Sequence, residues 1–215
     1  RGVDRAQFPY GYRPPADWLA QWHRDLPQLA GRYVVTLPAR LTRWKGQAHF
    51  IDIVAAVKAR GAPVHGLLVG GAHPRKRRYA DELARRAADA GLTAADITFL
   101  GERGDLREIM AVSDVVLSLS LEPEAFGRTS IEALSLGRPV AAYDHGGVGE
   151  QLAAVLPEGR VPAGDRDAVV DTLLRWRREP PAVPRDHPFT LARMLEETLA
   201  VYREVAPPRV RHDTR

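Results

Sequence analysis

The chain has 215 residues, 45% of them hydrophobic and 27% charged, a composition that suits one folded domain with a substantial core, or two small ones. It contains no cysteine, which excludes disulfides and cysteine-ligated metal sites and fits a cytoplasmic protein, and no apolar run approaches the roughly 20 residues that span a bilayer. The formal net charge of +4 suits a nucleotide, a membrane surface or a nucleic acid without choosing among them.

Short apolar strands alternate with amphipathic helices along the chain. Residues 1–30 supply a leading helix over Ala16–Leu29. Strands are expected at Tyr33–Leu37, Pro63–Gly70, Ile97–Leu100, Asp114–Ser120, Pro139–Tyr143 and, briefly, near Arg160–Val161. Helices are expected through Phe50–Val57, over residues 75–90, through Leu106–Met110, around Glu132, and over Arg166–Arg178 and Thr190–Val205. This alternation predicts an α/β, Rossmann-like parallel sheet with right-handed crossovers and helices on both faces.

The segment after the fourth expected strand is the most informative for function. Glu124 and Glu132 bracket it, and it leads into a short helix that Gly137 and Pro139 end. Ligands of open α/β sheets lie beyond the carboxyl ends of the strands, where helix N-termini attract anions. Gly127 allows close backbone approach, and the two carboxylates are acceptors for hydroxyl groups. Together these features predict a sugar nucleotide as ligand.

A structural alternative exists for the same segment. Thr129 to Glu132 fits a capping box, in which Glu132 reaches back to a backbone amide at the start of the helix. Glu124 is then a solvated loop acid with no binding role.

Arg40 and Lys45 follow the first expected strand, where a pyrophosphate would lie. A guanidinium binds phosphate oxygens as a fork and an ammonium adds a mobile charge, so the pair is suited to neutralise a leaving diphosphate. The alternative is that both are solvated surface cations.

Other ligand motifs are absent or have simpler explanations. Gly147-Val-Gly149 begins a dinucleotide fingerprint, but Leu152 occupies the third glycine position, and no P-loop is present. Asp165-Arg-Asp167 reads as a helix cap, and the seven histidines lack ligand spacing, so we expect no metal site. The basic run 74–79 is interpreted either as a solvated helix start or as a contact with anionic lipid, and nucleic acid is not expected.

Five motifs occur in the order seen in one enzyme family. They are Arg1-Gly-Val-Asp4, Arg40-Leu-x-x-x-Lys45-Gly46, Phe99-Leu-Gly101, Glu124-x-Phe-Gly-x-x-x-x-Glu132-Ala and Gly146-Gly-Val-Gly-Glu150. With these motifs the sequence resembles, over nearly its whole length, the C-terminal, donor-binding half of retaining GT-B glycosyltransferases of family four. It is most similar to bacterial members that build lipopolysaccharide or other envelope glycans.

The resemblance implies roles for matching residues. Glu124 would contact donor hydroxyls near the reacting carbon, Arg40 and Lys45 would stabilise the departing diphosphate, and Glu132 would hold the ribose. The remaining donor-binding residues implied by the resemblance are Phe126, Gly127, Arg128 and Thr129, which cradle sugar and phosphate, Gly101 and Arg103, which receive the base, and Gly70.

The resemblance also implies a reaction and a missing partner. A hexose would pass, with retention of configuration, from a UDP-, GDP- or ADP-sugar to an envelope glycan or lipid-linked acceptor, without cofactor or metal. The site would be cytoplasmic or on the inner face of the cell membrane. Because the chain starts at Arg1, we expect a piece of a longer protein whose N-terminal acceptor domain lies outside it, which would leave the isolated piece inactive. The segment 187–205 resembles the helix that crosses back to that domain. The alternatives are a non-catalytic sugar-nucleotide-binding module and an epimerase of the same fold.

Overall fold

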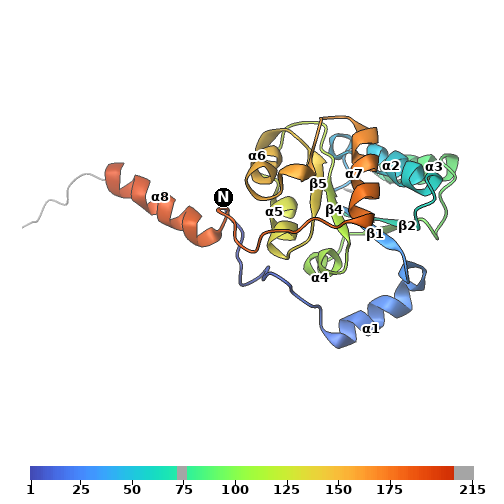
Figure 1. Ribbon diagram of the computed structural model, residues 1–215, viewed down its shortest axis with the longest axis horizontal. Helices are drawn as coiled ribbons and strands as arrows, with labels where there is room; N and C mark the ends of the chain where they lie inside the picture. The colour runs from blue at the N-terminus through green and yellow to red at the C-terminus, as the bar shows by residue number, and fades with distance from the viewer. Residues whose placement is uncertain (72–76, 206–215) are drawn as a thin grey trace, which may run out of the picture.

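A computed structural model describes residues 1–71 and 77–205 of the chain (Figure 1). In this part of the chain, six strands form one parallel sheet in the order β3-β2-β1-β4-β5-β6. Their bounds are β1 Tyr33–Pro38, β2 Val64–Val69, β3 Ile97–Gly101, β4 Val115–Ser118, β5 Val140–Tyr143 and β6 Arg160–Val161. The strand order reverses between β1 and β4, so the topological switch point, where such sheets bind ligands, lies between these two strands.

Helices cover both faces of the sheet, as Figure 1 shows. They are α1 Ala16–Asp25, α2 Gln47–Ala59, α3 Arg77–Asp89, α4 Leu106–Ala111, α5 Arg128–Ser135, α6 Gly146–Val155, α7 Arg166–Arg178 and α8 Leu191–Val205. Phe50 of α2 belongs to the large core that contains Val35 of β1, whereas Val34 packs with Trp22 of α1 and Ile109 of α4. Alternate residues of a strand therefore face two helical layers, and the predicted Rossmann-like α/β class is confirmed.

Some predicted boundaries were wrong. The leading helix ends at Asp25 instead of Leu29, and a 3-10 turn over Pro27–Leu29 follows it. Proline disfavours the helical backbone in the residue before it, and Leu26 has φ −129° and ψ 58°. The fourth strand is limited to Val115–Ser118 instead of Asp114–Ser120, whereas the final helix, Leu191–Val205, agrees with its prediction to within one residue. Residues 72–76, which include the start of the basic run, lie outside the described residues.

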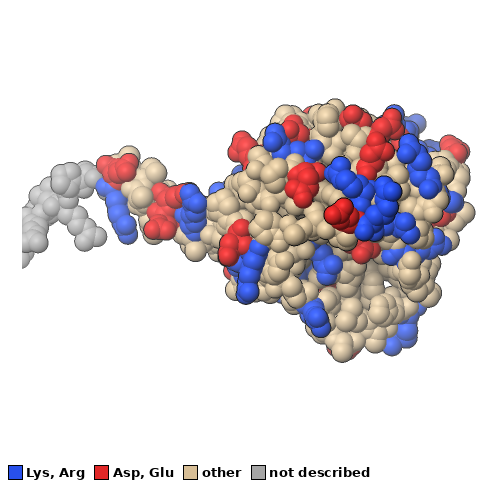
Figure 2. Space-filling model, in the orientation of Figure 1, with Lys and Arg blue, Asp and Glu red and all other residues tan. Residues whose placement is uncertain are grey.

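The N-terminal segment lies beside the residues that lead into α8. Val3 and Thr190 form a parallel bridge, with Val3 N donating to Phe189 O at 2.9 Å. From there α8 extends away from the sheet, and Figures 1 and 2 show it projecting beyond the body of the molecule. It has no buried residue, and Leu195, Leu199 and Tyr202 are 50%, 51% and 64% exposed. The large apolar side chains of the final helix are therefore exposed.

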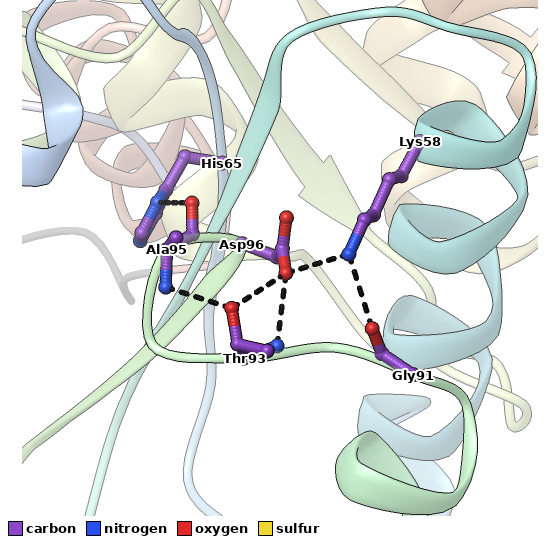
Figure 3. Close-up of polar contacts among 6 residues, drawn as sticks. All are labelled: Lys58, His65, Gly91, Thr93, Ala95 and Asp96. Carbon is purple, nitrogen blue, oxygen red and sulfur yellow. Dashed lines mark hydrogen bonds and ion pairs between the residues drawn. The ribbon is translucent and has the colours of Figure 1, made fainter.

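A polar network fixes the amino-terminal ends of β2 and β3, opposite the edge where a ligand is expected (Figure 3). Asp96 accepts hydrogen bonds from Lys58 Nζ at 2.8 Å and from the backbone and hydroxyl of Thr93. The fully buried His65 donates from Nδ1 to the carbonyl of Ala95 and accepts at Nε2 from the hydroxyl of Thr98. Both ring nitrogens are satisfied by the neutral imidazole, and burial lowers the pKa of His65.

Among the described residues, no helix has both the length and the apolar character required to cross a bilayer.

Candidate functional site

The loop after β1 is pressed against the carboxyl end of β4. Gly46 has φ +75°, and a Cβ atom on it would lie 2.0 Å from the carbonyl oxygen of Leu119. The backbone N–H of Leu121 donates to the carbonyl of Trp44 at 2.6 Å. Glycine is needed here both for its backbone conformation and for the close approach, which together bring the two loops of the switch point into contact.

Lys45 and Glu124, one from each loop, form an ion pair at this contact. Lys45 Nζ lies 2.6 Å from Glu124 Oε2, and the two side chains are only 16% and 18% exposed. The hydroxyl of Ser120 donates to the other carboxylate oxygen, Oε1. The Lys45 ammonium also lies 4.2 Å from the ring centroid of Trp44, in cation–π range. Two predicted catalytic residues therefore meet directly.

The N-terminus of α6 holds the backbone of this site. Gly147 N donates to the carbonyl of Glu124 at 2.8 Å, and His145 Nε2 donates to the carbonyl of Ser120 at 2.7 Å. A Cβ atom on Gly147 would lie 2.7 Å from the carbonyl oxygen of Ala125 and from Cα of Phe126. The absence of a side chain on Gly147 therefore allows α6 to pack closely against the loop that carries Glu124. Neither Ser120 nor His145 was predicted from the sequence, although Ser120 directly precedes the loop that carries Glu124 and His145 is the N-cap of α6.

Helix α5 starts at this loop. Its N-cap is Gly127, with φ +72° and no side-chain capping bond, so the capping-box alternative for Thr129 and Glu132 is wrong. Arg128 Nη2 donates to Glu132 Oε1 at 3.2 Å, with Arg128 80% exposed. Burial raises the pKa of Glu132, and the nearby Arg128 opposes this shift. Glu132 lines a cavity of about 220 Å³ together with Asp4, Phe126 and Arg128.

A larger pocket, of about 480 Å³, lies at the carboxyl ends of β1, β2 and β3. It is lined by four residues predicted from the sequence, Arg40, Gly70, Arg103 and Thr129, and by six others, Pro38, Ala39, Val69, Gly71, Glu102 and Leu106. A Cβ atom on Gly70 would lie 2.0 Å from the carbonyl oxygen of Ala39, so a side chain at this position would force the two strand ends apart. The volume is in the range of small-molecule sites.

Arg103 is fixed at the rim of this pocket. Its guanidinium donates two hydrogen bonds to Asp105, at 2.8 and 2.6 Å, and Trp18 Nε1 donates to the same carboxylate at 2.8 Å. The Arg103 guanidinium holds the pKa of Asp105 below its usual range. Gly101, with φ +67°, ends β3 and turns the chain into this loop. Asp105 and Trp18 were missed by the sequence reasoning.

The predicted residues thus fall into three groups at one edge of the sheet. Lys45 and Glu124 form the ion pair. Arg40, Gly70, Arg103 and Thr129 line the larger pocket, and Phe126, Arg128 and Glu132 line the smaller cavity. Gly101 and Gly127 adjoin these residues in the chain and line neither of the two cavities. The structure does not place Glu132 in the larger pocket. Asp165 accepts from Ala168 N at 2.9 Å, as predicted for a helix cap. No cluster of histidine or acidic side chains suited to a metal ion occurs in residues 1–71 and 77–205.

A family model described as "Glycosyl transferases group 1" matches residues 32–178. The chain belongs to this family. This stretch contains β1 to β6 and all three groups of site residues, and it leaves out Leu191 and the N-terminal residues that complete the lining of the smaller cavity.

Two curated relatives and one solved structure illustrate the similarity. The chain is 31% identical over 183 residues to 2-deoxystreptamine N-acetyl-D-glucosaminyltransferase of Streptomyces fradiae, covering 80% of this chain and 41% of that protein. It is 28% identical over 194 residues to lipopolysaccharide core biosynthesis mannosyltransferase LpsB of Rhizobium meliloti, covering 89% and 53%. The crystal structure of Anabaena Alr3699/HepE in complex with UDP and glucose matches with a TM-score of 0.78 and 26% identity, over 93% of this chain and 55% of that one. The chain therefore spans about half or less of the length of these relatives.

Proposed function

We propose that the chain is the donor-binding half of a retaining glycosyltransferase of family four and binds a nucleoside diphosphate sugar. The observation that carries this proposal is the meeting of Lys45 and Glu124 at the topological switch point, beside the N-terminus of α5 and next to the 480 Å³ pocket. Cations and helix amides at this point suit a diphosphate, and a carboxylate beside them suits a sugar hydroxyl. The UDP and glucose of the Alr3699/HepE structure support the same ligand class.

The ligand groups are distributed along the sheet edge. The base enters the larger pocket between Gly70 and the loop Gly101 to Arg103, where the fixed guanidinium offers a flat surface for stacking. The diphosphate lies between Arg40, Lys45 and the amides of Gly127 to Thr129. Glu124 accepts from hydroxyls of a hexose. Glu132 reaches the ribose after releasing Arg128, which is itself largely exposed and free to move.

The chemistry follows from these positions. The bond between the anomeric carbon and the diphosphate oxygen breaks, and its electron pair stays on that oxygen. Arg40 and Lys45 stabilise the charge that develops there, which is electrostatic catalysis of departure. The acceptor hydroxyl attacks the same face of an oxocarbenium-like carbon and gives its proton to the departing phosphate, so the configuration is retained.

The acceptor side completes the proposal. The acceptor is an envelope glycan or a lipid-linked glycan, and it is held by an N-terminal domain that lies outside this chain. The exposed face of α8 packs against that domain, and the transferase works in the cytoplasm or at the inner face of the membrane. LpsB, a mannosyltransferase of lipopolysaccharide core biosynthesis, supports this class of acceptor. No metal or other cofactor is required, because cationic side chains hold the diphosphate.

Calorimetric titration of the chain with UDP-, GDP- and ADP-sugars, with Lys45→Met as comparison, tests the binding step. We expect one nucleotide class to bind and Lys45→Met to weaken it at least tenfold, since a charge-assisted hydrogen bond is lost, on the order of 1.4 kcal/mol or more. Equal binding by the Lys45→Met variant would refute the proposed site.

A further inference from the structure

The Glu124 carboxylate is held at both oxygens, but its two partners differ in mobility. Ser120, two residues beyond the end of β4, is 5% exposed and donates its hydroxyl to Oε1, and its own carbonyl accepts from His145 Nε2 at 2.7 Å. Lys45 reaches Oε2 from the end of a flexible four-carbon chain. When a competing anion arrives, the ammonium can move while the carboxylate stays in place.

A diphosphate is such an anion, and it competes with Glu124 for Lys45. If Lys45 turns to the diphosphate, Glu124 Oε2 loses its cation and lies close to a second negative group, which is unfavourable in a partly buried site. A nucleotide sugar offsets this loss, because a sugar hydroxyl can donate to the released oxygen. A free nucleoside diphosphate has no sugar hydroxyl at that point and carries one more ionisable phosphate oxygen.

We propose that Glu124, oriented by Ser120, determines the preference of the site for a nucleotide sugar over the nucleoside diphosphate left after transfer. Glu124 does so by competing for Lys45 and by requiring a hydroxyl donor when Lys45 leaves. Ser120 and His145 are positioning residues in this scheme. The inference rests on the proposed function, and it adds a physical reason for release of the nucleoside diphosphate after transfer.

The test is the ratio of two dissociation constants, that of the nucleoside diphosphate over that of the matching nucleotide sugar, measured calorimetrically. The base is whichever of uridine, guanosine and adenosine the unmodified chain binds. The variants are Glu124→Gln and Ser120→Ala. Their matched controls are Glu122→Gln, which removes the same charge from an exposed residue of the same loop, and Ser118→Ala, which makes the same truncation at the last residue of β4. Circular dichroism melts confirm that each variant is folded.

We expect Glu124→Gln to bind the nucleoside diphosphate about tenfold tighter and to lower the ratio about tenfold or more, the scale of one charge-assisted hydrogen bond. Ser120→Ala lowers the ratio about threefold or more, and the two controls leave it unchanged.

Three results would overturn the inference while leaving the proposed function intact. They are an unchanged ratio in Glu124→Gln, an equal fall in Glu122→Gln, which would indicate net charge alone, and an unchanged ratio in Ser120→Ala, which would remove the positioning role. Failure of the unmodified chain to bind any nucleotide or nucleotide sugar would refute the proposed function and this inference together.

Discussion

Replacing Gly147 by alanine separates two explanations of the glycines at the start of α6. Helix propensity alone predicts that alanine stabilises the helix by up to about 1 kcal/mol. In the structure, however, the added Cβ would lie 2.7 Å from the carbonyl oxygen of Ala125 and from Cα of Phe126, and both are backbone atoms that cannot turn aside. The sign of the change in stability therefore distinguishes the two.

The expected size follows from these contacts. Relieving the overlap moves α6 away from the loop, which costs about 1–3 kcal/mol, and weakens the hydrogen bond from Gly147 N to Glu124 O, worth about 1 kcal/mol. The higher helix propensity of alanine offsets part of this cost, so the net loss in the free energy of unfolding is about 2 kcal/mol. For a chain of this length, that corresponds to a fall of about 4–8 °C in Tm. Nucleotide-sugar binding weakens as well, because Glu124 moves with the loop.

Urea unfolding and thermal melts measure the loss. Gly104→Ala is the matched control, because a Cβ atom there meets no atom within 4 Å, and its stability should change by less than about 0.5 kcal/mol. A Gly147→Ala variant as stable as the unmodified chain, or more stable, would refute the packing role.

Three further predictions concern the site and the fold. Glu132→Ala should weaken nucleotide binding by about 1–3 kcal/mol in calorimetry while the Tm stays unchanged. A lower Tm with unchanged nucleotide affinity would show that Glu132 has only a structural role. In the longer protein that carries the acceptor domain, Arg40→Ala and Lys45→Ala should each lower turnover by about a hundredfold or more, and full activity in either would remove that residue from the mechanism. Burial lowers the pKa of His65 in the folded chain, so below about pH 6.5 the unfolded chain binds more protons than the folded chain does. The free energy of unfolding should therefore fall as the pH drops through that value. Urea unfolding at several pH values measures this dependence, which should be smaller in His65→Gln.

The sheet was predictable because its central strands are buried on both faces and read as continuous apolar runs. All six residues of β1 and of β2 are buried, and each run is bounded in the sequence by glycine, proline or arginine. The end of α1 was mispredicted because apolar spacing continues through Leu29, while the local effect of Pro27 on Leu26 ends the helix.

The site was predictable only in part. Strand order and strand ends place Lys45 and Glu124 at the same edge, but their direct pairing depends on Gly46 packing against Leu119, which is a tertiary contact. The orientation of Glu132 toward the N-terminal segment was not predictable either, because the motif fixes its sequence spacing and the fold of residues 2–8 decides what it faces.

The most direct test of the proposed donor site is a titration of the isotope-labelled chain with UDP, GDP and ADP and their sugars, in excess EDTA, followed by backbone amide resonances. Binding at the switch point predicts that one nucleotide class shifts the amides of Gly46, Gly101 to Arg103, Gly127 to Thr129 and Gly147, and that His65 and its neighbours at the opposite edge are unaffected. Shifts confined to that opposite edge, binding that requires a divalent cation, or no shift with any nucleotide would contradict it.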